Sequence, residues 1–130
     1  MMLEVLASTK NFSTPSCHDD PIACIFIVIH NESAQIQQGD SYNKVAILLI
    51  NRRESMNIPK PPLGIRNNVH QTLVAKDEFE LYSKLISIFQ VHDPDILVGW
   101  ETEVMSIGYI CKRAEHALGF KLTDLISRNS

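Results

Sequence analysis

The alternation of apolar and polar positions divides the chain into a strand-rich first part and a helix-rich second part. Residues 22–30 (Ile-Ala-Cys-Ile-Phe-Ile-Val-Ile-His) form an almost continuous β-branched run, which is typical of a buried strand. Shorter apolar runs over residues 3–8, 45–50 and 69–75 predict three more strands, the last with the weakest pattern. The segment 59–64 contains three prolines, which remove three backbone donors, so we expect a loop there.

The hydrophobic period changes to that of a helix after residue 76. Asp77 can cap this helix, with Glu80 three residues later as in a capping box. Asp93-Pro94-Asp95 ends it as turn and cap residues. The predicted apolar face consists of residues at helical spacing, namely Phe79, Tyr82, Leu85, Ile86 and Phe89.

The last third of the chain predicts a short strand and a second helix. Residues 96–98 form a short apolar run that Gly99 ends, which favours a buried strand. A helix is expected over about residues 104–118, with Gly119 as its C-terminal stop. Its apolar face would contain Ile107, Ile110, Cys111 and Ala114. Together these elements predict an α/β fold, in the α+β sense of a mixed sheet flanked by helices, formed by residues 1–130 as a single domain.

Composition adds little to this picture, because hydrophobic residues make up 45% of the 130 and charged residues 21%, as in ordinary globular domains. No apolar run approaches the ~20 residues of a membrane span, so no membrane partner is expected. Three cysteines are too few for a disulfide framework and indicate free thiols. Cys17 and His18 near Cys24 lack the four-ligand spacing of structural zinc sites, and the five histidines are scattered, so no metal site is predicted.

The charge is unevenly distributed although the net value is only −3. Residues 42–75 carry five basic side chains against one acidic, whereas residues 76–111 carry two basic against seven acidic. The basic segment is a candidate DNA contact, and ordinary solvated loops are the stronger competing interpretation, because DNA-binding domains usually carry a denser basic surface. The candidate DNA-binding residues are Lys44, Arg52, Arg53, Lys60 and Arg66.

One segment resembles a catalytic motif. Residues 93–101 read Asp-Pro-Asp-Ile-Leu-Val-Gly-Trp-Glu and are followed by Ser106 and Tyr109. This segment is similar to the second motif of the proofreading domain of family B DNA polymerases, D-P-D-(I/V)-(I/L)-x-G-(Y/W)-N-x-x-x-F-D-x-x-Y. The resemblance implies a ribonuclease-H-like 3′-to-5′ exonuclease fold. Ser106 stands where that motif has its metal-binding aspartate, and Glu101 stands where it has the asparagine.

The start of the chain resembles the first motif of the same family, a D-x-E triplet that holds two metal ions. Glu4 matches the glutamate, and Met2 occupies the aspartate position. The third motif, Y-x-x-x-D, is not matched, because Arg113 stands four residues after Tyr109. This degeneracy resembles the zeta-type translesion branch of the family. Further support comes from Asp20-Pro21-Ile22, Asp77-Glu78, Leu81-Tyr82 and Ile126-Ser127-Arg128, so that the resemblance runs from Leu3 to Arg128.

The resemblance implies a catalytically degenerate exonuclease-like domain, truncated at its C-terminal end and part of a longer, nuclear polymerase chain. Its role would be structural or DNA-guiding in replication and repair. The domain would need no cofactor, whereas the parent polymerase would use Mg²⁺, with DNA and accessory subunits as partners. Two alternatives remain: a weakly active nuclease in which Glu101 and Glu103, on one face of an extended chain, rebuild a cation site beside Glu4, or a protein-interaction module that kept only the fold.

Overall fold

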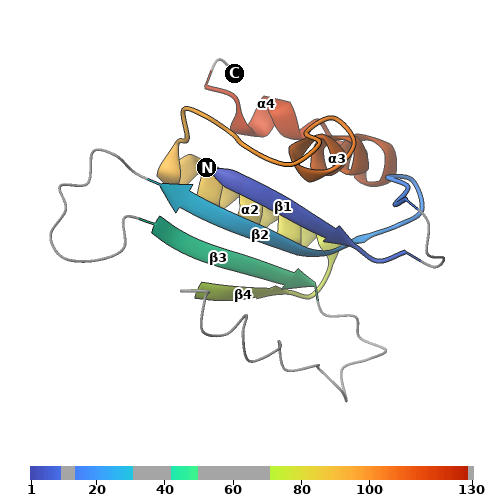
Figure 1. Ribbon diagram of the computed structural model, residues 1–130. Helices are drawn as coiled ribbons and strands as arrows, with labels where there is room; N and C mark the ends of the chain where they lie inside the picture. The colour runs from blue at the N-terminus through green and yellow to red at the C-terminus, as the bar shows by residue number, and fades with distance from the viewer. Residues whose placement is uncertain (10–13, 31–41, 50–70, 129–130) are drawn as a thin grey trace, which may run out of the picture.

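Four strands form one mixed sheet in the computed structural model, which describes residues 1–9, 14–30, 42–49 and 71–128. The strand order is β1-β2-β3-β4, where β1 pairs with β2 and β2 with β3 antiparallel, and β4 runs parallel to β3 (Figure 1). The expected mixed sheet is thereby confirmed. The strands are β1 (Met2–Ala7), β2 (Ile22–His30), β3 (Tyr42–Leu49) and β4 (Gln71–Ala75).

The strand limits follow the apolar runs closely, because these runs supply the buried side chains. The strand expected over residues 22–30 is found with those limits, and the one expected from residue 45 begins at Tyr42. Ile50, Val69 and His70, at the ends of two expected strands, lie outside the described residues. Along β1, Leu3 is buried while Met2 is 46% exposed, as the alternation of side chains between the two faces of a strand requires.

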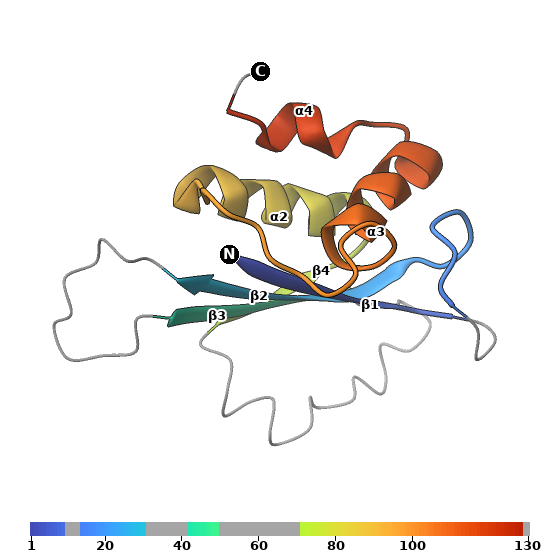
Figure 2. The same ribbon diagram turned by 45° about the horizontal axis from the view of Figure 1, so that its top comes forward.

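The described helices lie on one face of the sheet, so the core forms between helices and strands (Figure 2). They are α2 (Glu78–His92), α3 (Ser106–Arg113), a π-helical continuation η1 (Ala114–Leu118) and the short α4 (Leu122–Ile126). The sequence did not predict α4, because its five residues are too few to show a helical period. The core includes Leu3, Ile25, Ile27, Leu81, Tyr82, Leu85, Tyr109, Ile110 and Leu122.

Helix α2 begins and ends where its capping residues predict. The Asp77 carboxylate accepts a hydrogen bond from the Glu80 backbone N–H at 2.8 Å. The Glu80 carboxylate accepts in turn from the Lys76 N–H at 3.2 Å, one residue before the cap. Asp93 ends the helix in the left-handed region (φ 41°), and its N–H donates to the Phe89 carbonyl. The capping interpretation is therefore confirmed.

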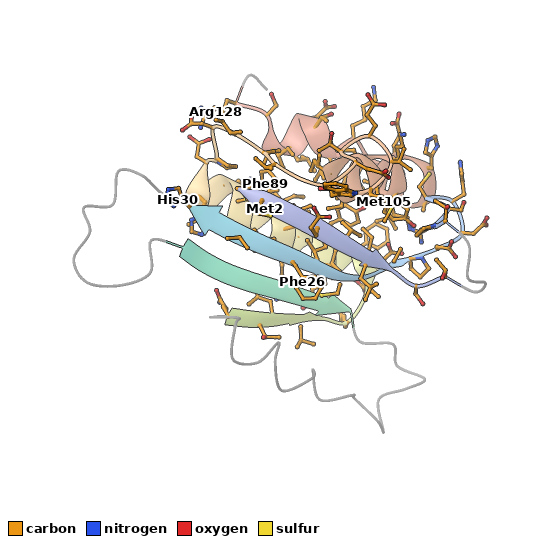
Figure 3. The ribbon with its side chains drawn as sticks, viewed as in Figure 1. Met2, Phe26, His30, Phe89, Met105 and Arg128 are labelled. Atoms are coloured by element: carbon orange, nitrogen blue, oxygen red, sulfur yellow. The ribbon has the colours of Figure 1, made fainter. Side chains whose placement is uncertain are left out.

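The turn after α2 is also held by contacts with a distant arginine, which the sequence did not predict. Arg128, labelled in Figure 3, donates from Nε to the Asp93 carboxylate and from Nη2 to the Asp93 carbonyl, both at 2.7 Å. Its Nη1 lies 2.7 Å from the Asp95 carboxylate. These exposed ion pairs join the C-terminal end of α2 to the segment that follows α4.

Two details of the expected packing are wrong. Phe79 was expected on the buried face of α2 but is 60% exposed, since the buried stripe is centred on Leu81, Leu85 and Phe89 and Phe79 lies at its border. Residues 96–98 were expected as a buried strand, but only Val98 makes a bridge, to Met2, and it is 53% exposed. This segment follows the outer edge of the sheet beside β1, where the described residues provide no strand on its other side.

The second helix begins two residues later than expected and changes its winding near its end. α3 starts at Ser106, and the expected end at residue 118 is the end of η1. Gly119 then adopts φ 78°, the left-handed conformation that favours glycine at a helix C-terminus. Of the predicted apolar face, Ile110 and Ala114 are fully buried.

Candidate exonuclease-like site

The site resembling an exonuclease centre is built by β1 and the loop that leads into α3. The Leu3 N–H donates to the Val98 carbonyl at 3.0 Å, and the Val98 N–H donates to the Met1 carbonyl at 2.9 Å. This short parallel pairing brings the loop before α3 against the edge of β1, and Figure 3 labels Met2 on the strand and Met105 in the loop. The two motifs, about 100 residues apart in sequence, therefore meet at one edge of the sheet.

Glu4 is half-buried and already has a partner, because its carboxylate Oε1 accepts a hydrogen bond from the Trp100 backbone N–H at 2.7 Å. Glu101 follows immediately and adopts a positive φ of 47°. The backbone N–H groups of Val104 and Met105 both donate to the Glu101 carbonyl. Residues 101–105 therefore form a turn, and the extended chain that was expected to place Glu101 and Glu103 on one face does not exist.

Ser106 is buried at the first position of α3, with its side chain turned to the strand. Its Oγ donates to the Leu3 carbonyl, and the residue is only 1% exposed. The close approach depends on Gly99, because a Cβ on Gly99 would lie 2.0 Å from the Ser106 Oγ. Ser106 itself adopts a positive φ of 54°. The hydroxyl is thus used in a bond that fastens α3 to β1.

A buried arginine on α3 connects several elements. In the sequence it stood out only because it lies four residues after Tyr109, where the third motif would have its aspartate. Arg113, on α3, forms a bidentate contact with Glu78 of α2, with Nε at 3.0 Å and Nη2 at 2.6 Å from the two carboxylate oxygens. Its Nη1 donates to the carbonyls of Cys17 and His18 at 3.1 and 2.9 Å. The hydrogen bond to Glu78 raises the pKa of Arg113, whose guanidinium is protonated in proteins in any case.

Two buried tyrosines complete these connections. The Tyr82 hydroxyl donates to the Ile110 carbonyl at 2.7 Å, and the Tyr109 hydroxyl donates to the Asp20 carbonyl at 2.6 Å. Burial raises the pKa of Tyr109 to about 12. The pairs Asp20-Pro21 and Leu81-Tyr82, which carried part of the family resemblance, thus supply buried structural contacts.

Comparison with known proteins finds the same family that the two motifs at this site resemble. The family described as DNA polymerase family B, exonuclease domain, matches residues 3–129. The chain belongs to this family. Similar relatives are the DNA polymerase zeta catalytic subunits of Mus musculus (28% identical over 132 residues), Drosophila melanogaster (29% over 126) and Homo sapiens (30% over 132), each alignment covering 97% of the chain. The chain spans 4% of the length of the mouse and human proteins and 6% of the fly protein.

Membership of the family B exonuclease-domain family implies a ribonuclease-H-like fold. It confirms the resemblance that the two motifs gave. No helix in the described ranges is long and apolar enough to cross a membrane.

Several candidate residues of this exonuclease domain remain without a described position. Lys44 lies on β3, but its side chain is outside the described part, as are Arg52, Arg53, Lys60 and Arg66. The proposed basic contact to DNA stays a prediction.

The potential metal ligands that lie close together belong to neither of the two motifs of the exonuclease domain. Within the described ranges, one group of at least three such side chains has its donor atoms within 4.8 Å of one another, and it consists of Cys17, His18 and His116. Glu4, Glu101 and Glu103 are not part of any such group. Cys24 does not join Cys17 and His18, because it is buried on β2 as a core residue. The spacing of the histidines along the sequence did not predict this cluster, and the expectation that the chain holds no metal stays a prediction.

Proposed function

We propose that this chain is a catalytically degenerate 3′-to-5′ exonuclease-like domain of a zeta-type translesion DNA polymerase. In this proposal residues 1–130 are part of a longer polymerase chain, and the domain braces that chain or guides a DNA strand. The similarity to zeta catalytic subunits over 97% of the chain supports the polymerase assignment.

One observation carries the proposed loss of catalysis, namely the donor groups at the motif positions. Two-metal hydrolysis of a phosphodiester needs carboxylates that hold both ions about 3.5 to 4 Å apart. Met2 offers a thioether, which is a soft ligand unsuited to Mg²⁺. Ser106 offers a neutral hydroxyl that donates to the Leu3 carbonyl, and Glu4 accepts from Trp100. Two magnesium ions do not fit this donor set, so we assign these exonuclease positions no metal.

The parent enzyme would add nucleotides to a primer at a separate polymerase site, where Mg²⁺ would be used. DNA and polymerase accessory subunits would be its partners, and the nucleus would be its location. A polymerase without proofreading extends past damaged bases more readily, because no competing reaction removes the nucleotide just added. A degenerate exonuclease domain suits that role.

Incubation of the purified chain with a 3′-labelled single-stranded oligonucleotide and millimolar Mg²⁺ or Mn²⁺ tests the proposal. We expect the oligonucleotide to stay intact with both metals, and the Glu4→Gln variant to behave identically. Trimming of the 3′ end by the wild-type chain that is lost in Glu4→Gln would contradict the proposal and establish the weakly active nuclease instead.

A protein-interaction module is the second candidate function, because large apolar side chains are exposed on the loop beside β1. Trp100 is 77% exposed, Ile96 69% and Val104 50%. Electrophoretic retention of a labelled single strand at increasing salt separates the two functions. Affinity for DNA that falls with salt supports strand guiding, since phosphate contacts release counterions. Absence of retention at low salt favours the interaction module.

A further inference from the structure

Cys17, His18 and His116 come together from opposite parts of the sequence, and none of them belongs to an exonuclease motif. Their ligand atoms all lie within 4.8 Å of one another. The imidazole rings of His18 and His116 have centroids 4.5 Å apart and are tilted by 41°. Figures 1 and 2 both show residues 14–21, which lead into β2, beside the C-terminal end of α3. His116 lies on η1, which continues α3.

The turn that presents Cys17 and His18 is held rigidly by neighbouring groups. The Asp20 carboxylate accepts from the Ser16 N–H at 2.9 Å, and the Asp20 N–H donates to the Ser16 carbonyl at 2.8 Å. Arg113 then donates to the carbonyls of Cys17 and His18, and its guanidinium is fixed by Glu78. Because the backbone of this turn is already fixed, a ligand that binds to its side chains causes little further loss of backbone entropy.

The third ligand is carried by an unusual helical segment. His116 lies in the π-helical turn Ala114–Leu118, three residues after Arg113. π-helical turns inside helices are rare and frequently mark functional sites. Arg113, which fixes the turn, and His116, which faces it, therefore belong to one continuous helical element. This element holds the three ligands in place relative to one another.

We propose that Cys17, His18 and His116 bind Zn²⁺. A thiolate and two imidazoles are ligands that zinc accepts readily and Mg²⁺ does not. Zinc–sulfur and zinc–nitrogen bonds of about 2.3 and 2.1 Å place tetrahedral ligands roughly 3.3 to 3.6 Å apart, so the cluster needs only a small contraction. Both histidines are exposed and Cys17 is half-exposed, which leaves the side chains free to turn towards the ion. Water occupies the fourth position.

Bound zinc fastens the turn at residues 16–20 to the end of α3, next to the Arg113–Glu78 contact. The site thus adds a metal clamp to a domain whose exonuclease positions we assign no metal. This inference is independent of the proposed function, because it uses no motif residue.

Substitution of Co²⁺ for Zn²⁺ in the purified, reduced chain tests the site directly. We expect visible d–d bands of tetrahedral intensity together with a thiolate-to-cobalt charge-transfer band in the near ultraviolet, and both should disappear when Zn²⁺ is added. Zinc affinity is then measured by competition with a chromophoric chelator. Because binding requires a thiolate and neutral imidazoles, the affinity should fall as the pH is lowered.

The ligand variants are Cys17→Ser, His18→Asn and His116→Asn, with matched controls elsewhere in the chain. Cys111→Ala removes another thiol, and His92→Asn removes an exposed imidazole at the end of α2. Loss of a group that only supports a metal ligand typically weakens metal affinity by about 10- to 100-fold. Each ligand variant should weaken zinc binding by more than that, and the controls should leave zinc affinity unchanged. Cys17→Ser should also remove the charge-transfer band. Circular dichroism confirms that each variant is folded.

Arg113→Lys distinguishes positioning from ligation. It keeps the positive charge but loses the planar arrangement of donors, so zinc affinity should fall by about 10- to 100-fold while the charge-transfer band remains. The proposal is overturned if cobalt gives no thiolate band, or if the ligand variants and the controls bind zinc equally.

Discussion

At the scale of single residues, the serine in place of a metal-binding aspartate has a structural role. Ser106 is buried and its hydroxyl donates to the Leu3 carbonyl, which joins the start of α3 to β1. An aspartate there would bring a negative charge against that carbonyl oxygen, which would be costly without a cation to compensate it. Gly99 leaves the space that this contact needs.

Gly99→Ala should destabilise the domain by about 1 to 3 kcal/mol, because the added methyl group overpacks the contact with Ser106. The new Cβ would lie 2.0 Å from the Ser106 Oγ and 3.1 Å from the Leu3 carbonyl oxygen. The free energy of unfolding is measured by urea denaturation.

Gly119→Ala is the matched control for this substitution. Nothing lies within 4 Å of a Cβ at Gly119, and its φ of 78° makes the cost one of backbone conformation alone, about 1 to 2 kcal/mol. An unchanged denaturation midpoint in Gly99→Ala would show that the loop before α3 moves freely away from Ser106.

At the scale of elements, nearby side chains define where a helix begins and ends, but they do not define which of its side chains pack against other elements. Asp77 caps α2 through the Glu80 N–H, and Gly119 ends η1 in a left-handed conformation. These features depend on residues within four positions of one another, so the sequence predicted them. The exposure of Phe79 depends instead on how α2 is rotated against the sheet.

Asp77→Ala should lower the free energy of unfolding by about 1 kcal/mol, because the Glu80 N–H loses its acceptor at the helix N-terminus. Asp77→Asn keeps an acceptor oxygen at the same position and should cost much less. Both values come from urea denaturation at neutral pH. Equal losses in the two variants would mean that the charge of Asp77, and not its hydrogen bond, stabilises α2.

At the scale of the whole molecule, a few buried polar groups connect elements that are distant in sequence. Glu78 binds Arg113 from 35 residues away, and Arg113 reaches the carbonyls of Cys17 and His18 across 96 and 95 residues. Every buried side-chain polar atom in the described part has a hydrogen-bond partner, so this network leaves no buried polar side-chain group unpaired there. They hold the turn before β2 against α2 and α3.

The stability of the whole molecule should fall as the pH rises above about 9. Burial raises the pKa of the Cys24 thiol from its ordinary 9.0 to about 12 and that of the Tyr109 hydroxyl from 10.0 to about 12. Below pH 9 both groups are protonated in the folded and unfolded chain, so their contribution is constant. From about pH 9 for the Cys24 thiol and about pH 10 for the Tyr109 hydroxyl, up to about pH 12, only the unfolded chain releases the proton. This favours unfolding by up to about 1.4 kcal/mol per pH unit for each group.

Urea denaturation at a series of pH values measures this slope. Cys24→Ala removes one of the two groups and should flatten the decline between pH 9 and 10, before tyrosines of the unfolded chain ionise. A slope identical to that of the wild-type chain in this window would show that Cys24 ionises equally in the folded and unfolded states.

The sequence by itself determined the features that depend on near neighbours or on a recognisable motif. The β-branched run of β2, the cap at Asp77 and the stop at Gly119 follow from local sterics and hydrogen bonding. The family followed from the segment 93–101 and from Glu4, because such motifs are specific in spacing. The sequence also shows directly that positions 2 and 106 carry a methionine and a serine in place of carboxylates.

Only the tertiary structure decided which residues that are distant in sequence lie close together in space. Residues 96–98 are as apolar as a buried strand, yet they lie exposed at the sheet edge because burial depends on what packs on both sides. Cys17 and His18 lacked metal spacing in sequence, because their third partner, His116, arrives only when η1 folds against their turn. Spacing along the chain describes neighbours within one element, whereas this cluster is made by contact between two.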